Sequence, residues 1–161
     1  MEITIFDTLE NLSIPFDRIR HPAVYTSEQA RRLVPQNAAK ASKNLFLRDK
    51  KGRNYILLAV AENKTVRFDD IERQTGFKRL SLASENSLQK YLGITPGAVS
   101  LLALINDTQG QVAVLIDRKL WTGGCIQVHP LVNTETLIIS IEDLAKFIQY
   151  TGHTIHFVDV A

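Results

Sequence analysis

Apolar residues recur at helical spacing in several separate stretches of the chain. Residues 3–12 place Ile5, Leu9 and Leu12 on one face of a helix that Pro15 ends. Further helices are predicted over residues 27–34, 70–75, 85–92 and 141–151. Each of them has a Ser, Thr or Asp where an N-cap is needed and a Pro or Gly just beyond its end. The predicted caps are Thr26 or Ser27, Asp69, Ser84 and Ser140, the last paired with Asp143 in a capping box.

Strand-like segments lie between these helices. Residues 44–49 and 53–60 flank a turn and predict a β-hairpin, and residues 100–107 and 111–117 predict a second one. Residues 125–130, 136–141 and 154–160 predict three more strands. Short strands mixed with short helices favour an α+β fold with a mixed sheet, because the regular strand–helix alternation of a doubly wound fold is absent. At 161 residues, we expect one domain over 1–161.

Composition narrows the class of protein. With 45% hydrophobic and 22% charged residues, the chain is typical of a folded protein that does not enter a membrane. The N-terminal segment is acidic where a signal peptide would be basic, so a cytoplasmic location is expected. One cysteine allows no internal disulfide, and no cluster has zinc-ligand spacing, so no metal site is predicted.

Charge is unevenly distributed along the chain. Ten Lys and Arg residues fall between Arg18 and Arg53, against only Glu28 and Asp49, whereas acidic residues predominate elsewhere. A basic segment of this kind suits a polyanion such as RNA. Solvated charge on helices and a hairpin turn is an equally good interpretation. Standard phosphate-binding glycine loops and the GxSxG elbow are absent from the sequence.

Four segments in order resemble the YbaK/prolyl-tRNA-synthetase editing-domain superfamily: residues 21–30, 40–60, 81–104 and 128–153. They include "HPAVYTSEQA", a lysine just before a strand, a Pro-Gly loop and "HPLVNT". Within the superfamily, the chain is most similar to free-standing alanyl-tRNA(Pro) deacylases. The resemblance implies a YbaK-like mixed, partly barrel-like sheet surrounded by short helices. It also implies hydrolysis of the ester between a wrong amino acid and the terminal adenosine of tRNA(Pro), in which a ribose hydroxyl of that adenosine helps to place the water.

The resemblance also implies that no cofactor and no metal take part. The expected partner is the 3′ acceptor end of tRNA(Pro), with prolyl-tRNA synthetase as a further candidate, and neither membrane nor DNA. Two alternatives stay open. In the first, the substrate is cysteinyl-tRNA(Pro) or another small aminoacyl-tRNA. In the second, the chain is a non-hydrolytic module that binds tRNA or the synthetase.

The resemblance implies two groups of catalytic residues. Lys43 matches the signature lysine, which would hold the terminal nucleotide, although an ordinary exposed lysine is the plainer interpretation. Backbone N–H groups of the loop Gly97, Ala98, Val99 and Ser100 would stabilise charge on the ester carbonyl oxygen; a simple turn after Pro96 is the alternative. Leu101 stands where the family usually has proline, which frees an N–H group and makes the loop geometry and full activity uncertain.

Five residues are predicted to bind the substrate. His129 would form a wall of the amino-acid pocket and limit the side chain that enters, although a histidine in a strand is also commonly a satisfied core residue. Asn133 and Thr134 would hydrogen-bond the adenosine or brace the turn, and Thr26 and His21 would line the pocket.

Overall fold

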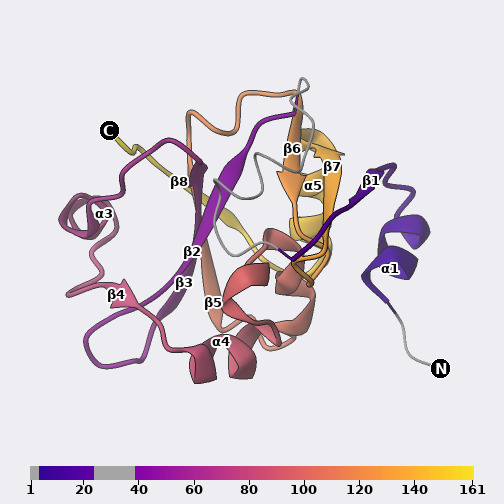
Figure 1. The fold of residues 1–161 in the computed structure, drawn as a ribbon. Helices are drawn as coiled ribbons and strands as arrows, with labels where there is room; N and C mark the ends of the chain where they lie inside the picture. Colours follow the sequence, from indigo (N-terminus) through magenta and orange to yellow (C-terminus); the bar gives the residue numbers. More distant parts are fainter. Residues whose placement is uncertain (1–3, 24–38) are drawn as a thin grey trace.

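The computed structural model describes residues 4–23 and 39–161. Its helices are α1 (Ile5–Asn11), α3 (Phe68–Thr75), α4 (Glu85–Leu92) and α5 (Ile141–Tyr150), with short 3₁₀ helices η1 (Pro96–Ala98) and η2 (Leu101–Asn106). Its strands are β1 (Asp17–Arg20), β2 (Ser42–Arg48), β3 (Tyr55–Ala61), β4 (Ser81–Leu82), β5 (Val112–Asp117), β6 (Cys125–Val128), β7 (Glu135–Ser140) and β8 (Ile155–Val158). The α+β class is therefore confirmed (Figure 1).

The strands form two sheets that do not close into a barrel. The larger sheet has the order β4-β2-β3-β5-β8; β2 and β3 form the predicted antiparallel hairpin, whereas β3, β5 and β8 run parallel. This sheet is mixed, as predicted. The smaller sheet is antiparallel with the order β1-β7-β6. A parallel bridge between Lys40 and Ile126 joins the chain just before β2 to β6.

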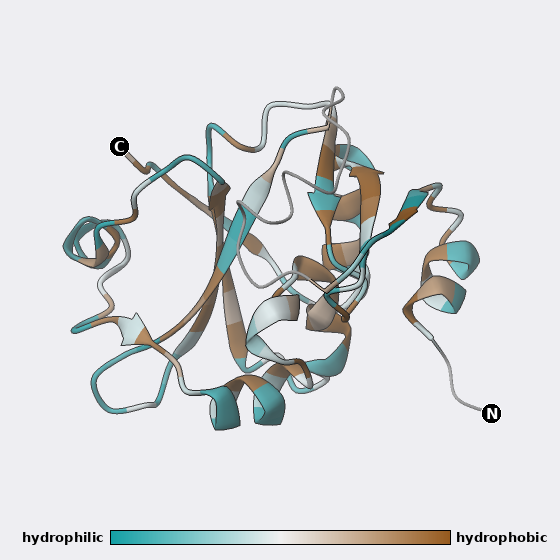
Figure 2. Ribbon diagram, viewed as in Figure 1, coloured by the Kyte–Doolittle hydropathy of each residue, from teal (hydrophilic) through white to brown (hydrophobic). Residues whose placement is uncertain are grey.

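Two apolar cores lie on opposite faces of the five-stranded sheet. The first core contains side chains from both sheets and from α1, α4 and α5, among them Leu57, Leu137 and Leu144. The second core lies under α3 and contains Leu58 and Ile71. Strand β3 contributes alternate residues to each core, which explains its nearly continuous apolar sequence. Apolar residues accordingly run along β3 and β5, and polar ones cover the outer side of α4 (Figure 2).

The prediction of a strand over residues 100–107 is wrong. This segment contains η2, and its first four residues are fully buried. The Ser100 hydroxyl accepts a hydrogen bond from the N–H of Leu102 and starts the helix, and the N–H of Asp107 donates to the carbonyl of Leu104 at its end. An apolar run buried on all sides has no periodicity by which strand and helix can be told apart. The second predicted hairpin therefore does not exist, and β5 pairs in parallel with β3 instead.

Helix ends follow the predictions in part. Ser84 caps α4 and Ser140 caps α5, each by accepting a backbone N–H three residues ahead. The Asp143 carboxylate accepts the Ser140 hydroxyl, at 2.9 Å. Helix α3 begins two residues earlier than expected, after Arg67, so Asp69 lies in its first turn, where a carboxylate stabilises the helix dipole, and is not its cap. The predicted helix over residues 27–34 lies outside the described residues.

A buried polar cluster holds the C-terminal end of α5. The Nε2 atom of His153 lies 2.7 Å from Asp107 Oδ2, and its Nδ1 atom lies 2.8 Å from Thr151 Oγ1. The same carboxylate accepts two backbone N–H groups at the start of β5. His153 thus joins the helix end to the sheet.

Candidate functional site

His129 follows β6 directly, and its ring is held by the neighbouring strand. Its Nδ1 atom lies 3.1 Å from the backbone carbonyl of Glu135. Because a carbonyl only accepts, Nδ1 carries the hydrogen, and Nε2 of the neutral ring is left as an acceptor. Burial lowers the pKa of His129 below its ordinary value of 6.5, the carbonyl of Glu135 opposes this, and the nearby His21 lowers it further. His129 is therefore a fixed, neutral imidazole at pH 7.

His21 lies at the same end of β7 although it comes from the opposite end of the chain. Its backbone N–H donates to the carbonyl of Thr134 at 2.9 Å. Its Nδ1 atom lies 2.8 Å from the carbonyl of Pro22, and its Nε2 lies 2.8 Å from the buried hydroxyl of Thr136. The structure thus brings two predicted substrate-binding residues, His21 and His129, to the first residues of β7.

The loop between β6 and β7 has a constrained backbone. Pro130 is buried, and Leu131 has a φ of 69°, a left-handed conformation uncommon for a residue other than glycine. The Leu131 side chain packs against the first core, which holds this conformation in place. The side chain of Thr134 is exposed, and Asn133 is half-buried. The predicted pocket residues on this loop therefore stand on a fixed framework.

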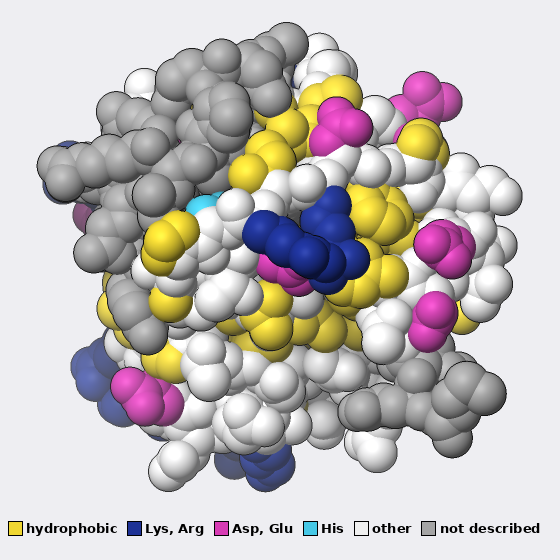
Figure 3. Space-filling model, turned by 45° about the vertical axis from the view of Figure 1, so that its right-hand side comes forward, with side chains coloured by type: hydrophobic (Ala, Val, Ile, Leu, Met, Phe, Trp, Pro, Cys, Tyr) yellow, Lys and Arg dark blue, Asp and Glu magenta, His cyan; other side chains and the backbone are white. Residues whose placement is uncertain are grey.

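Glu135 anchors β1 to β7 at the same place. Its Oε1 atom lies 2.6 Å from Arg18 Nε and 3.2 Å from Arg20 Nε. The hydrogen bond from Arg18, with a smaller contribution from Arg20, lowers the pKa of the Glu135 carboxyl below 4.5. Figure 3 shows basic side chains beside an acidic one and next to apolar side chains on this face. The positive charges of Arg18 and Arg20, two residues of the basic segment, are thus partly neutralised by Glu135.

The loop predicted to bind the ester carbonyl borders the first core. Gly97 and Ala98 belong to η1, and the N–H of Ala98 donates to the carbonyl of Thr95 at 3.0 Å. Ser100 is fully buried, and its hydroxyl is used to cap η2. The Ser100 hydroxyl is therefore committed to the loop itself, which leaves the predicted role to backbone groups. Leu101 is the first residue of η2 and lies in the first core.

Lys43 lies near the start of β2, opposite Val60 of β3. Val60 belongs to the second core, so Lys43 points to that face of the sheet, whereas the Gly97 loop and His129 border the first core. The structure therefore does not place the Lys43 side chain on the same face as the other predicted residues. Lys43 lies in the sequence between Lys40, which pairs with Ile126 of β6, and Leu47, which pairs with β4.

Asn44 is the residue that sequence reasoning missed. It follows Lys43 on β2 and shares the face of Phe46, which belongs to the first core. Its Oδ1 atom is buried and has no hydrogen-bond partner among the described residues. A buried, unpaired amide oxygen is uncommon in folded proteins and is suited to a ligand donor. The signal in the sequence is a polar residue at a core-facing position of an otherwise apolar strand.

A family model described as the aminoacyl-tRNA editing domain matches residues 21–147. The chain belongs to this family. It is 37% identical over 152 residues to prolyl-tRNA editing protein ProX of Acetoanaerobium sticklandii, covering 94% of this chain and 93% of that protein. It is 36% identical over 148 residues to prolyl-tRNA synthetase associated domain-containing protein 1 of Danio rerio, covering 91% and 80%.

Solved structures share the fold of this editing domain. The hypothetical protein APE2540 superposes with a TM-score of 0.75 at 18% identity, covering 97% of both chains. A candidate trans-editing enzyme for prolyl-tRNA synthetase superposes with a TM-score of 0.71 at 16% identity, covering 95% of this chain and 92% of that one. The predicted family and fold are therefore confirmed.

The remaining predictions concern Thr26, metals and membranes. Thr26 lies outside the described residues. Over residues 4–23 and 39–161, no group of three or more metal-ligating side chains is present. No helix in those same ranges has the length and apolar character needed to cross a membrane.

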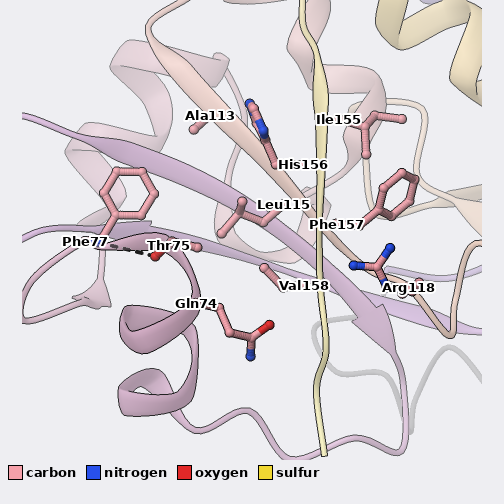
Figure 4. A pocket seen from close by; sticks show the side chains of 10 residues that line it. All are labelled: Gln74, Thr75, Phe77, Ala113, Leu115, Arg118, Ile155, His156, Phe157 and Val158. Carbon is pink, nitrogen blue, oxygen red and sulfur yellow. Dashed lines mark hydrogen bonds between the residues drawn. The ribbon is translucent and has the colours of Figure 1, made fainter.

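A cavity of about 570 Å³ borders the edge strand β8 of the editing domain, next to α3. Ala113, Leu115 and His156 lie on one side of β8, and Ile155, Phe157 and Arg118 lie on the other (Figure 4). None of the predicted site residues lines this cavity, and two of its polar side chains, Gln74 and Thr75, bond to nearby backbone. The candidate site is therefore the region of His129, His21 and the start of β2.

Proposed function

We propose that the chain is a free-standing cytoplasmic deacylase that hydrolyses alanyl-tRNA(Pro). The observation that carries the proposal is the match to ProX over 94% of this chain and 93% of that protein, because it indicates the same domain organisation over the matched length. The part of the substrate that binds in the site would be the 3′ terminal adenosine of the tRNA and the ester attached to it. Prolyl-tRNA synthetase, which produces this error, would be the natural neighbour in the cell.

The geometry of His129 supports selection by size. An imidazole held at one nitrogen by Glu135 and followed by the buried Pro130 forms a rigid wall. A rigid wall excludes a larger side chain such as proline, whereas attraction in a pocket distinguishes a methylene by only ~1 to 3 kcal/mol. The rigid wall is the reason we assign His129 to substrate selection; a general base would also be held at Nδ1 with Nε2 free as an acceptor, so the two roles are separated by experiment.

Attack on the ester is assigned to a water positioned by the substrate and by β2. An aminoacyl ester is already activated, so placement of the water and charge stabilisation suffice. Lys43 would pair with the phosphate of the terminal nucleotide, and Asn44 Oδ1 would accept a hydrogen bond from the adenosine or the amino group. Because Lys43 and Asn44 point to opposite faces of β2, a substrate that contacts both would have to reach across the edge of this strand. Backbone N–H groups of the Gly97 loop would stabilise the developing oxyanion.

The deciding experiment measures hydrolysis of four aminoacyl forms of tRNA(Pro): alanyl, cysteinyl, seryl and prolyl. Each is compared with its spontaneous hydrolysis without protein and with alanyl-tRNA(Ala), which tests the choice of tRNA. The expected result is fast release of alanine from tRNA(Pro) with prolyl-tRNA left intact. Preference for the cysteinyl ester would move the chain to the cysteinyl branch. Tight tRNA binding without hydrolysis of any ester would make it a binding module.

A further inference from the structure

Lys40 lies at the junction of the two sheets. Its backbone N–H donates to the carbonyl of Cys125 at 2.8 Å, and its carbonyl accepts the N–H of Gln127 at 3.0 Å. Lys40 comes shortly before Lys43 and Asn44 on one side of the candidate site, and Gln127 comes shortly before His129 on the other. This pairing therefore connects the two sides directly.

The Lys40 side chain makes a second connection, to the loop between β5 and β6. Its Nζ atom lies 2.6 Å from Thr122 Oγ1, 3.0 Å from the carbonyl of Gly123 and 3.3 Å from the carbonyl of Leu120. An ammonium group has three N–H donors, so these three acceptors satisfy it completely. None of them is a carboxylate, and in the described part of the chain no salt bridge of Lys40 is found.

The loop that receives the ammonium group is itself held in shape. Gly123 and Gly124 have φ values of 95° and 78°, in the left-handed region that glycine adopts without strain. The carbonyl of Gly124 accepts the N–H of Ile141 at 2.8 Å, at the start of α5. The loop is thus fixed between Lys40 on one side and α5 on the other.

We propose that Lys40 is a positioning residue that sets the separation between β2, with Lys43 and Asn44, and the β6–β7 loop, with His129. The Ser42 hydroxyl, which donates to the carbonyl of Gln127 at 3.4 Å, supports the same contact. The kinetic consequences rest on the proposed deacylase function, but the positional claim does not. Because its charge is used inside the protein, Lys40 is not a contact to tRNA phosphate although it belongs to the basic segment.

The test compares Lys40→Met, which keeps the chain length and removes the ammonium group, with Lys119→Met. Lys119 is an exposed lysine of the same β5–β6 loop and makes a matched control. Three quantities are measured: kcat for alanyl-tRNA(Pro), the salt dependence of tRNA binding, and the NMR signals of the His129 amide and ring. For Lys40→Met we expect kcat to fall about tenfold or more, as misplaced reacting groups do. We also expect shifted His129 signals and an unchanged salt slope, and no effect on kcat or His129 in the control.

Thr122→Val supplies a second variant that removes the shortest of the three contacts and leaves Lys40 intact. It should lower kcat in the same direction by a smaller factor, and the double variant should be no slower than Lys40→Met, because the two changes break one interaction. If Lys40→Met fails to fold, the effects of Thr122→Val on kcat and on the His129 signals decide the question alone.

Distinct results would overturn the positioning role and the deacylase function. Unshifted His129 signals in Lys40→Met and Thr122→Val, with kcat within twofold of the wild type, would overturn positioning. A salt slope reduced by about one would make Lys40 a phosphate contact instead. Absence of hydrolysis by the wild type would overturn the deacylase function, and the His129 signals would then decide the role of Lys40 independently.

Discussion

The Nδ1 atom of His129 lies 3.1 Å from the backbone carbonyl of Glu135. The ring is therefore oriented by the main chain of β7, the strand that also holds His21 through Thr134 and Thr136. A histidine held in this way has one ring nitrogen committed and little freedom to rotate. A ring held in this way can form a wall of the pocket, and its free Nε2 could also accept a proton, so the effect of removing the ring distinguishes the two roles.

Replacement of His129 by Ala should relax specificity more than it slows the reaction. Without the ring, the pocket gains room for the pyrrolidine of proline, so the preference for alanyl- over prolyl-tRNA(Pro) should fall by about tenfold or more. The rate with the alanyl ester should change much less. The measurement is kcat/KM for both esters. A large loss of rate with an unchanged preference would instead assign His129 to proton transfer.

Stability should depend on the protonation of His129. Its pKa in the folded state is below 6.5, so between the two values the unfolded chain binds more protons than the folded one. The free energy of unfolding should therefore fall as the pH decreases below about 6.5. His129→Asn, which keeps an N–H donor for Glu135, should lose this part of the pH dependence. Urea titrations of both proteins from pH 8 to pH 5 measure it, and identical curves would contradict a half-buried, neutral ring.

Lys43→Ala should lower kcat/KM for alanyl-tRNA(Pro) by about a hundredfold, because the terminal nucleotide loses a fixed contact. The salt dependence of tRNA binding should also weaken by about one unit of slope, which separates Lys43 from Lys40. Lys119→Ala, at an exposed position of the β5–β6 loop, is the control. A Lys43→Ala protein with wild-type rate would remove Lys43 from the site, in line with its position on the second-core face.

Leu101→Pro tests whether the departure from the family pattern matters. Leu101 is the first residue of η2, a position where proline is tolerated, and Ser100 before it has the extended backbone that a following proline requires. The loop should therefore keep its shape and the rate per folded molecule should stay within about twofold of the wild type. The lost side chain is buried in the first core, so unfolding should become easier by about 1 to 3 kcal/mol. Urea unfolding and the deacylation rate, measured on the same samples, separate the two effects. A much faster enzyme would mean that leucine impairs the loop.

Local patterns in the sequence were sufficient for most of the secondary structure. The hairpin of β2 and β3, the caps Ser84 and Ser140 and the buried face of α5 all follow from periodicity and from capping chemistry. Residues 100–107 could not be assigned correctly, because a fully buried apolar run has no polar face to mark its period. The short strand β1, rich in charge, depends on pairing with β7 and gave no apolar signal.

By itself, the sequence determined the fold class and the family, since these depend on residue types at short spacing, and it predicted a role for the His-Pro loop. Only the tertiary structure decided which side chains share a face. It brought His21 to His129, turned Asn44 and not Lys43 toward the first core, and placed the Lys40 ammonium group among three loop oxygens. Such relationships depend on strand register and on contacts between residues far apart in the chain. A change of one residue in register would reverse every one of the β2 assignments.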